Sequence, residues 1–362
     1  MILATPGFPK APLLPTGGSK GYRIAPAGAN KGLGIFATRH IKAGELIIDE
    51  RPLLVLPATT SAVDVVLFAM GVIGNSNSKF TEEEQCQIRV HAMDRAIRNL
   101  VERMSPEKRK AFMELSVCKE QAVTGEFYGR LTTNGILIDH KEFNDELLPG
   151  NLMTTYNAIC DEISRINHSC SPNATFYWNT ASFSVRIHAV RDIPVSDEIT
   201  ISYHATLQSF ADRAKALTEY SIKPCMCGPA CDPDPARIRA GDARRASIMR
   251  QIFMTKAVPL WHLRSLEHGT QKTILEDCVK RLKEMEEECL EDANGYGDLL
   301  RYVVEGYAYL GKREEVLKYA KKLERACRAF GESFDERYLS KDGMERIGIR
   351  KAGERESVKE KK

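Results

Sequence analysis

Two short stretches of the chain carry residue types that can do chemistry. RINHSCSPN spans residues 165–173 and contains Asn167, His168 and Cys170. CMCGPAC spans residues 225–231 and supplies three cysteines. Thiolates and imidazoles are the usual ligands of zinc, and histidine often serves as a general acid or base. Taken singly, His168 could equally be a hydrogen-bonded core histidine, and Asn167 could be a turn residue. Whether either has a functional role therefore depends on the residues around it.

Cysteine usage separates the second stretch from the rest of the chain. Of the ten cysteines, seven are scattered singly and three, Cys225, Cys227 and Cys231, are bunched. A structural zinc site takes four tetrahedral ligands, so a CxCxxxC cluster is one ligand short. Two interpretations stay open: a turn with chance cysteines, or a zinc site completed from elsewhere in the fold, for which Cys170 is a candidate.

A glycine turn and a tyrosine extend the set of candidates. The GLG sequence from Gly32 to Gly34 is either a plain hairpin turn or a place where a ligand approaches the backbone closely. It is not GxGxxG and does not open a helix, which argues against a dinucleotide fold. Tyr203 ends the strand-like DEITISY and fits either a core aromatic or an active-site group.

Strand-rich and helix-rich segments alternate along the chain and must position these residues. Short apolar runs broken by glycine predict strands over residues 22–56, and strand character returns over residues 131–203. The stretch between them, about residues 61–130, is expected to be helical, with a capping box at Thr81 and Glu84. A second helix start is expected at Ser105-Pro106, where a capping serine precedes a proline at the first helical position.

Helical character also dominates the second half. A helix is expected over residues 208–220, before the cysteine cluster. Apolar residues at helical spacing then form one stripe, made of Ile274, Leu275, Cys278, Leu282, Met285 and Cys289. The next stretch predicts a helical hairpin with its break at Gly311, which loosely resembles one tetratricopeptide unit.

Composition bounds the class of protein. A chain of 362 residues has room for two domains, and its 43% hydrophobic and 28% charged content is ordinary for a globular protein. The net charge of +3 is too small to argue for nucleic acid, and no apolar run is long enough for a membrane helix, so we expect neither sequence-specific nucleic-acid binding nor a membrane partner. Residues 1–20 and 341–362 are expected to be disordered tails.

Four blocks occur together and in a fixed order: GLGIFATRHIKAGELI, RINHSCSPN, VRIHAVRDIPVSDEITISY and CMCGPAC. In this combination the chain resembles SET-domain protein-lysine methyltransferases, and within them the SMYD-like group and fungal SET proteins. The resemblance implies an α+β fold with a SET-domain β-fold and pseudoknot over residues 21–222, interrupted by the helical insert. It also implies a post-SET zinc segment over 223–240 and an α-helical, tetratricopeptide-like region over 241–340. No cysteine/histidine cluster between the glycine turn and NHSC could form the MYND zinc module of true SMYD proteins.

The resemblance also implies roles for single residues. S-adenosylmethionine is expected to contact Lys31, Gly32, Leu33, Gly34, Asn134, Asn167, His168 and Tyr203. Tyr203 is the expected catalytic tyrosine, and Tyr220 and Tyr156 are expected to line the channel for the substrate lysine. In such proteins the NHSC block supplies the fourth ligand of a structural zinc ion, which nominates Cys170 beside Cys225, Cys227 and Cys231.

The implied function is transfer of a methyl group to a lysine side chain of a histone or another protein, in the nucleus, the cytoplasm or both. In-line attack on a sulfonium requires a neutral amine, so the site must lower the lysine pKa from about 10.4 and align the two reactants. The alternative is a SET-fold scaffold with little activity that recruits a peptide partner through its helical C-terminal region. The presence of Asn167, His168 and Tyr203 favours the enzyme.

Overall fold

Small sheets lie at the centre of the computed structural model, which describes residues 7–15, 18–28, 31–57, 67, 70–72, 79–118, 125–138, 155–223, 225, 227–257, 268–293 and 295–346. The first sheet has the order β1 (Tyr22–Pro26), β2 (Leu33–Ala37), β10 (Glu198–Ile201) and β7 (Asn167–His168). The second has the order β3 (Leu46–Glu50), β9 (Ser184–Ala189) and β8 (Ala174–Asn179). The third has the order β4 (Leu54–Pro57), β6 (Tyr156–Ile159) and β5 (Ile136–Ile138).

The first sheet brings the distant sequence blocks together. Strand β10 lies between β2, to which it is antiparallel, and β7, to which it is parallel. Ile199 of β10 pairs with Ile35 of β2, and both side chains are fully buried. On the other side, Thr200 pairs with Asn167 and Ile201 with His168. The turn before β2 and the Asn-His pair therefore meet at β10.

The predicted helical insert is confirmed in the described residues between β4 and β5. It contains α2 (Glu82–Val101), α3 (Pro106–Met113) and α4 (Glu126–Asn134). The capping box of Thr81 and Glu84 is present at the start of α2, and Ser105 caps α3 with a proline at its first turn. Ile97, Val101 and Phe112 are buried in a core shared with Ile159 of β6, which fixes the insert to the third sheet.

The second half of the chain is mainly helical, as expected. Its elements are α5 (Phe210–Leu217), the short 3-10 turns Thr218–Tyr220 and Gly228–Cys231, α6 (Pro235–Ala257), α8 (His268–Glu287), α9 (Tyr296–Tyr309), α10 (Arg313–Phe330), the 3-10 turn Glu336–Leu339 and α11 (Lys341–Arg346). The predicted stripe is buried at Leu275, Cys278, Leu282 and Met285. Gly311 breaks the α9–α10 hairpin with a φ of 69°, in the left-handed region that favours glycine.

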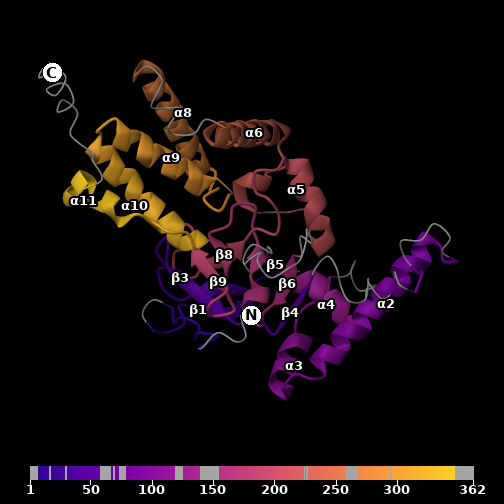
Figure 1. Ribbon diagram of the computed structural model, residues 1–362. Coiled ribbons are helices and arrows are strands. Elements are labelled where there is room, and N and C mark those ends of the chain that lie inside the picture. The colour runs from indigo at the N-terminus through magenta and orange to yellow at the C-terminus, as the bar shows by residue number, and fades with distance from the viewer. Residues whose placement is uncertain are drawn as a thin grey trace, which may run out of the picture.

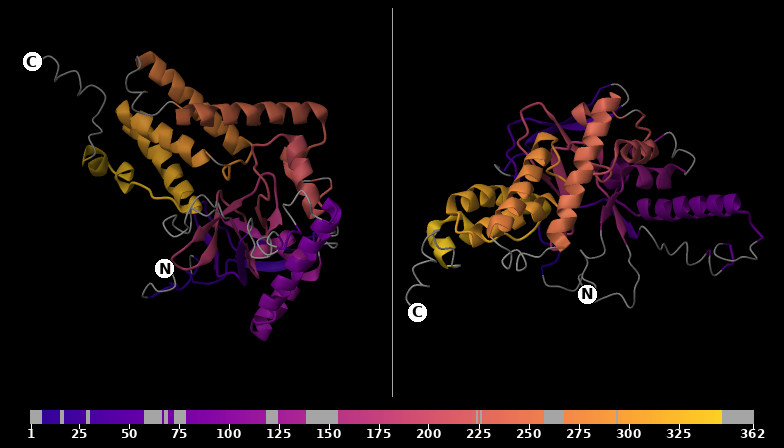
Figure 2. Two further views of the ribbon diagram at one scale, coloured as in Figure 1. Left: turned by 45° about the vertical axis from the view of Figure 1, so that its right-hand side comes forward. Right: turned by 90° about the horizontal axis from the view of Figure 1, so that it is seen from above.

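The two helical regions lie on opposite sides of the strands (Figures 1 and 2). Helices α2 to α4 extend away on one side, whereas α8 to α11 cover the other and α10 packs on β8 and β9. Helices α5 and α6 connect the sheets to the C-terminal helices. Among the described residues, no helix is both long and apolar enough to cross a membrane.

Parts of both expected tails have defined contacts. The backbone N–H of Lys10 donates to the carbonyl of Ala181, and that of Leu13 donates to the Asp49 carboxylate, so residues 7–15 lie along the second sheet. At the other end, residues 341–346 form α11 because Met344 is buried against the helical core and Glu345 pairs with Arg313. Residues 1–6, 16–17 and 347–362 of the expected tails lie outside the described residues.

Candidate active site

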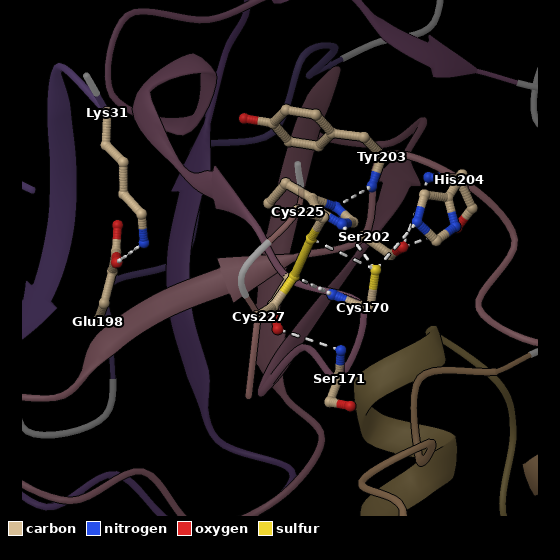
Figure 3. Close-up of a disulfide and its surroundings, with 11 residues drawn as sticks. Lys31, Cys170, Ser171, Glu198, Ser202, Tyr203, His204, Cys225 and Cys227 are labelled. Carbon is tan, nitrogen blue, oxygen red and sulfur yellow. Dashed lines mark hydrogen bonds and ion pairs between the residues drawn. A yellow bond between two sulfur atoms is a disulfide. The ribbon is translucent and has the colours of Figure 1, made fainter. Parts of the chain in front are cut away.

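The glycine turn, β7 and β10 meet at one carboxylate, that of Glu198. The side-chain amide of Asn167 donates to Glu198 Oε1 over 2.7 Å and to the Leu33 carbonyl over 3.1 Å. Lys31 Nζ lies 3.8 Å from Glu198 Oε2, with the lysine side chain half exposed (Figure 3). Three of the residues expected at the cofactor site are thus linked to this carboxylate, Lys31 and Asn167 directly and Leu33 through Asn167. The result is an opposite-charge pair beside an open turn.

Gly34 and Gly32 of the turn differ in why glycine suits each position. A Cβ added at Gly34 would lie 2.6 Å from Glu198 Oε1 and 3.0 Å from Asn167 Nδ2, so only hydrogen allows these groups to approach the backbone. Gly32 has a φ of +66°, and a Cβ there would meet no atom within 4 Å. The turn is therefore closed on the Asn167 side and open on the other, as a backbone surface for a ligand requires.

Tyr203 lies just after β10, and hydrogen bonds hold both its backbone and its hydroxyl. Its backbone N–H donates to Nδ1 of His168 over 3.1 Å, and its hydroxyl donates to the Ile166 carbonyl over 2.7 Å. Burial raises the pKa of Tyr203 well above its ordinary value, so the phenol stays protonated at neutral pH. Its ring lies 4.8 Å from that of Tyr220, whose pKa is also raised by burial. The two rings form an aromatic pair, and Tyr203 also packs against the cluster of Cys170, Leu217 and Cys231.

His168 joins the tyrosine to the sulfur cluster through its two ring nitrogens. A backbone N–H can only donate, so Nδ1 of His168 must accept from Tyr203. Burial lowers the pKa of His168 to about 3, so the ring is neutral and carries its single proton on Nε2. Nε2 lies 3.3 Å from the sulfur of Cys170. This N–H therefore points at the sulfur, and His168 is a hydrogen-bond donor to Cys170.

The cysteines expected to bind zinc gather around Cys170. Its sulfur lies 3.8 Å from that of Cys225, and its backbone N–H donates to the sulfur of Cys227 over 3.3 Å (Figure 3). The donor atoms of His168, Cys170, Cys225 and Cys227 all lie within 4.8 Å of one another. Two thiolates at ~2.3 Å from a tetrahedral zinc ion would be about 3.8 Å apart, so the spacing fits that metal. Cys225 and Cys227 are joined by a disulfide, so they could act as zinc ligands only after reduction.

Three groups compete to be the fourth donor. His168 is excluded by its tautomer, because its Nε2 carries a proton. Cys231 packs in the same buried cluster, and its hydrogen bond with Cys170 together with the charge of Arg213 lowers its pKa. His204 Nδ1 donates to the Ala205 carbonyl over 3.1 Å, which leaves the lone pair of Nε2 directed at Cys170, 3.4 Å away. Cys231 remains our predicted ligand, and His204 is the alternative that the geometry adds.

Two other expected site residues have different surroundings. The side-chain amide of Asn134, at the end of α4, donates to the carbonyls of Ser116 and Arg130, both over 2.8 Å. Its two amide hydrogens are therefore engaged in holding the insert, and its proposed contact with the cofactor would have to use its oxygen or its backbone. Tyr156 begins β6 and packs against the same core as Tyr203. Its place in a lysine channel stays a prediction.

Glu198, His204 and Arg213 were missed from the sequence. Glu198 lies inside the quoted block DEITISY, so its position in the pattern offered a signal. His204 follows the expected catalytic tyrosine directly. Arg213 lies in the middle of α5, and nothing in the sequence pattern indicated that its side chain is buried.

Comparisons with known proteins found similarity to one family. The SET domain family matches residues 32–204. Histone-lysine N-methyltransferase set5 of Schizosaccharomyces pombe is 28% identical over 228 residues, which cover 63% of this chain and 56% of that protein. Human N-lysine methyltransferase SMYD2 is 24% identical over 202 residues, covering 54% and 44%. Human histone-lysine N-methyltransferase SMYD3 is 40% identical over 65 residues, covering 18% and 15%. The chain thus spans about half the length of the first two relatives.

Proposed function

The chain belongs to the SET-domain proteins, and we propose that it is an S-adenosylmethionine-dependent protein-lysine N-methyltransferase. The observation that carries the proposal is the meeting of the glycine turn, Asn167 and Glu198 on one sheet, together with the partly buried Tyr203–Tyr220 pair that follows β10 of that sheet. The glycine turn with Asn167 and Glu198 offers polar and backbone groups for a zwitterionic ligand. The two tyrosines offer an aromatic wall for an alkyl amine.

The Lys31–Glu198 pair would receive the amino-acid end of S-adenosylmethionine. That end carries one ammonium and one carboxylate, and the pair presents one charge of each sign at 3.8 Å. The open face of Gly32 would let the ligand lie against the backbone, since no atom lies where its side chain would be. The bound cofactor supplies a methyl group activated by a neighbouring sulfonium charge. The part of this chain is to orient it and to exclude water.

Tyr203 and Tyr220 would form the lysine side of the site. A phenol with a raised pKa is a poor base, so Tyr203 acts by position and not by removing a proton. Its hydroxyl donates its own hydrogen to the Ile166 carbonyl, which leaves its oxygen lone pairs for a substrate amine. The aromatic wall disfavours a charged ammonium and so shifts lysine toward the neutral form that can react.

The sulfur cluster would hold a structural zinc ion through Cys170, Cys225, Cys227 and Cys231 once all four are reduced. Each thiolate of the cluster comes from a segment next to the site: Cys170 follows His168, and the other three follow Tyr220. A metal here would tie residues 223–240, the proposed post-SET segment, to the NHSC block. It would hold Tyr220 against Tyr203 without taking part in methyl transfer.

Mass spectrometry of methylated lysines tests the proposal. The reduced, zinc-loaded protein is incubated with isotope-labelled S-adenosylmethionine and a cell extract, and proteins are then digested and sequenced. We expect labelled methyl groups on lysine side chains of a small set of proteins. Cofactor binding by calorimetry without any labelled lysine would overturn the enzyme assignment. That result would favour the scaffold that the helical C-terminal region also allows.

A further inference from the structure

Glu50, the last residue of β3, has a carboxylate that accepts three successive backbone N–H groups. Its Oε1 accepts from Asp161 over 2.7 Å, and its Oε2 accepts from Ile163 over 2.9 Å. The N–H of Glu162, between them, lies 3.2 Å from both oxygens. Glu50 and Asp161 are 111 positions apart in the sequence. A side chain of the second sheet therefore holds the start of the segment that leads into β7.

The three N–H groups stand at the beginning of a 3-10 turn, Ile163–Arg165. The first N–H groups of a helix have no acceptor inside it and need one from elsewhere. Within the described part of the chain, the side chain of Glu162 at the N-cap position makes no capping hydrogen bond. Its carboxylate instead contacts Lys20 and the hydroxyl of Tyr22. Glu50 thus caps the turn from a different strand.

The turn connects this cap to the carbonyl that binds Tyr203. The N–H of Ile163 is one of the three that bind Glu50, and the Ile163 carbonyl accepts the N–H of Ile166 over 3.0 Å. The Ile166 carbonyl in turn accepts the Tyr203 hydroxyl over 2.7 Å. One short series of backbone hydrogen bonds therefore runs from the Glu50 carboxylate to the expected catalytic tyrosine.

Apolar packing holds the turn in place but does not orient this carbonyl. Ile163 and Ile166 are each 1% exposed, in the core that also contains Ile48 of β3. Burial of apolar side chains is non-directional, whereas a hydrogen bond depends on the direction of its acceptor. The direction of the Ile166 carbonyl follows the peptide planes of the turn, and these are what the Glu50 carboxylate binds.

We propose that Glu50 is a positioning residue for methyl transfer: its carboxylate holds the backbone of residues 161–163 so that the Ile166 carbonyl directs the hydroxyl of Tyr203. The inference rests on the function proposed above. Glu50 acts through the backbone and not on substrate or cofactor. A displacement of about 1 Å in an orienting group can lower the rate of a reaction by about 100-fold, which sets the upper limit of the expected effect.

Glu50→Gln is the first test. It keeps the shape of the side chain but replaces one acceptor oxygen by an amide donor, which cannot bind these N–H groups. We expect kcat for lysine methylation to fall by about 10–100-fold, with a much smaller change in KM for the protein substrate. Glu162→Gln is the matched control, because it removes a charge from the same turn and leaves the Glu50 carboxylate in place. Equal losses of kcat in the two variants would overturn the proposal.

A double-mutant cycle with Tyr203→Phe separates positioning from a loss of stability. Tyr203→Phe has no hydroxyl for the Ile166 carbonyl to direct, so adding Glu50→Gln should lower kcat little further. Effects that multiply in the double variant would overturn the proposal. Glu50→Asp keeps the charge on a side chain one methylene shorter and should show the same coupling with a smaller loss. It replaces Glu50→Gln in the cycle if chemical denaturation shows that Glu50→Gln does not fold.

The NMR signal of the Tyr203 ring tests the inference apart from the proposed function. In protein with isotope-labelled tyrosine, this signal is assigned by its loss in Tyr203→Phe. It should shift in Glu50→Gln and stay in place in Glu162→Gln. A parent that shows this pattern but methylates no lysine would overturn the proposed function and support the positioning of Tyr203 by Glu50. An active parent whose Tyr203 signal is the same in Glu50→Gln would overturn the inference alone.

Discussion

The backbone N–H of Tyr203 donates to Nδ1 of His168 over 3.1 Å, while Nε2 of the same ring faces the sulfur of Cys170 at 3.3 Å. One neutral imidazole thus bridges the expected catalytic tyrosine and the expected metal site. The ring accepts a hydrogen bond from the backbone of Tyr203 and donates one to the sulfur of Cys170, and no other tautomer satisfies both contacts. Any change in the sulfur cluster that rotates this ring would therefore also alter the hydrogen bond from the backbone of Tyr203.

Replacing Tyr203 by phenylalanine should lower kcat for lysine methylation by about 10²–10³-fold, the usual cost of removing one positioned hydrogen-bonding group. The substitution removes only the hydroxyl that holds the ring to the Ile166 carbonyl. Cofactor affinity, measured by calorimetry, should change much less than kcat. Tyr302→Phe, in the C-terminal core, is the control and should keep full activity. A kcat for Tyr203→Phe equal to that of the parent would remove the assigned role.

Replacing Gly34 by alanine should weaken S-adenosylmethionine binding by about 10–100-fold, because overpacking of 1–3 kcal/mol must be relieved by moving Glu198 or Asn167. The added Cβ would lie 2.6 Å from the Glu198 carboxylate. Calorimetric titration measures the affinity.

Gly28→Ala is the matched control for Gly34. Gly28, whose carbonyl accepts the backbone N–H of Lys31 over 3.4 Å, has a φ of +99° and open space where a Cβ would be, so alanine costs about 1–2 kcal/mol of backbone strain without adding a contact to Glu198 or Asn167. Its expected signature is a lower free energy of unfolding with cofactor affinity retained. Equal loss of affinity in both variants would mean that the turn is disturbed as a whole.

Metal analysis of the reduced protein should find about one zinc ion per chain. Cys231→Ser and Cys170→Ser should each lower the zinc content and the free energy of unfolding together, because metal binding and folding of the site are coupled. Cys86→Ser, on the exposed side of α2, should leave both unchanged. Zinc retained by Cys231→Ser but lost by His204→Ala would identify His204 as the fourth ligand.

Stability should fall as the pH drops from 7 to 5, partly because of His188. Burial lowers the pKa of His188 to about 4, with Arg186 acting in the same direction and Asp49 and the Gly44 carbonyl against it. As the pH falls, His188 takes up a proton near pH 6.5 in the unfolded chain but only near pH 4 in the folded protein. The stability contributed by the neutral ring is therefore present above that pH and lost below it, by about 2 kcal/mol between pH 7 and 5.

His188→Gln isolates this contribution, since glutamine does not titrate and can still donate to the Gly44 carbonyl. Chemical denaturation of parent and variant at several pH values measures the free energy of unfolding. The variant should show a shallower loss toward pH 5 than the parent. Parallel curves would show that His188 does not contribute to the pH dependence.

Features that depend on local sequence were predictable. Thr81 with Glu84 marks a helix start, and Gly311 marks a hairpin break, because each acts on its immediate neighbours. The strands of the second sheet followed from their β-branched and aromatic content. The SET domain itself was recognised from blocks that are each continuous in sequence, and the family match over residues 32–204 bears this out.

Features that depend on contacts across the fold were not predictable. The contact of Glu198 with Asn167 joins residues 31 positions apart, and no pattern in either block specifies it. Arg213 is buried because of what packs around α5, not because of its own helix. Residues 7–15 were expected to be disordered from their composition, yet Lys10 docks through its backbone, which composition does not report.

The position of β10 between β2 and β7 has a consequence for how the chain folds. Ile199 pairs with Ile35, so this pairing cannot form until nearly all of the SET region, residues 32–204, has been synthesised. Contacts of such long sequence separation are slow to form because the entropy of closing the loop is lost before they stabilise anything. The groups that would bind cofactor and lysine sit on this strand and its neighbours. The active site should therefore be assembled in a late, rate-limiting step of folding, so the recovery of cofactor binding after dilution from denaturant would report that step.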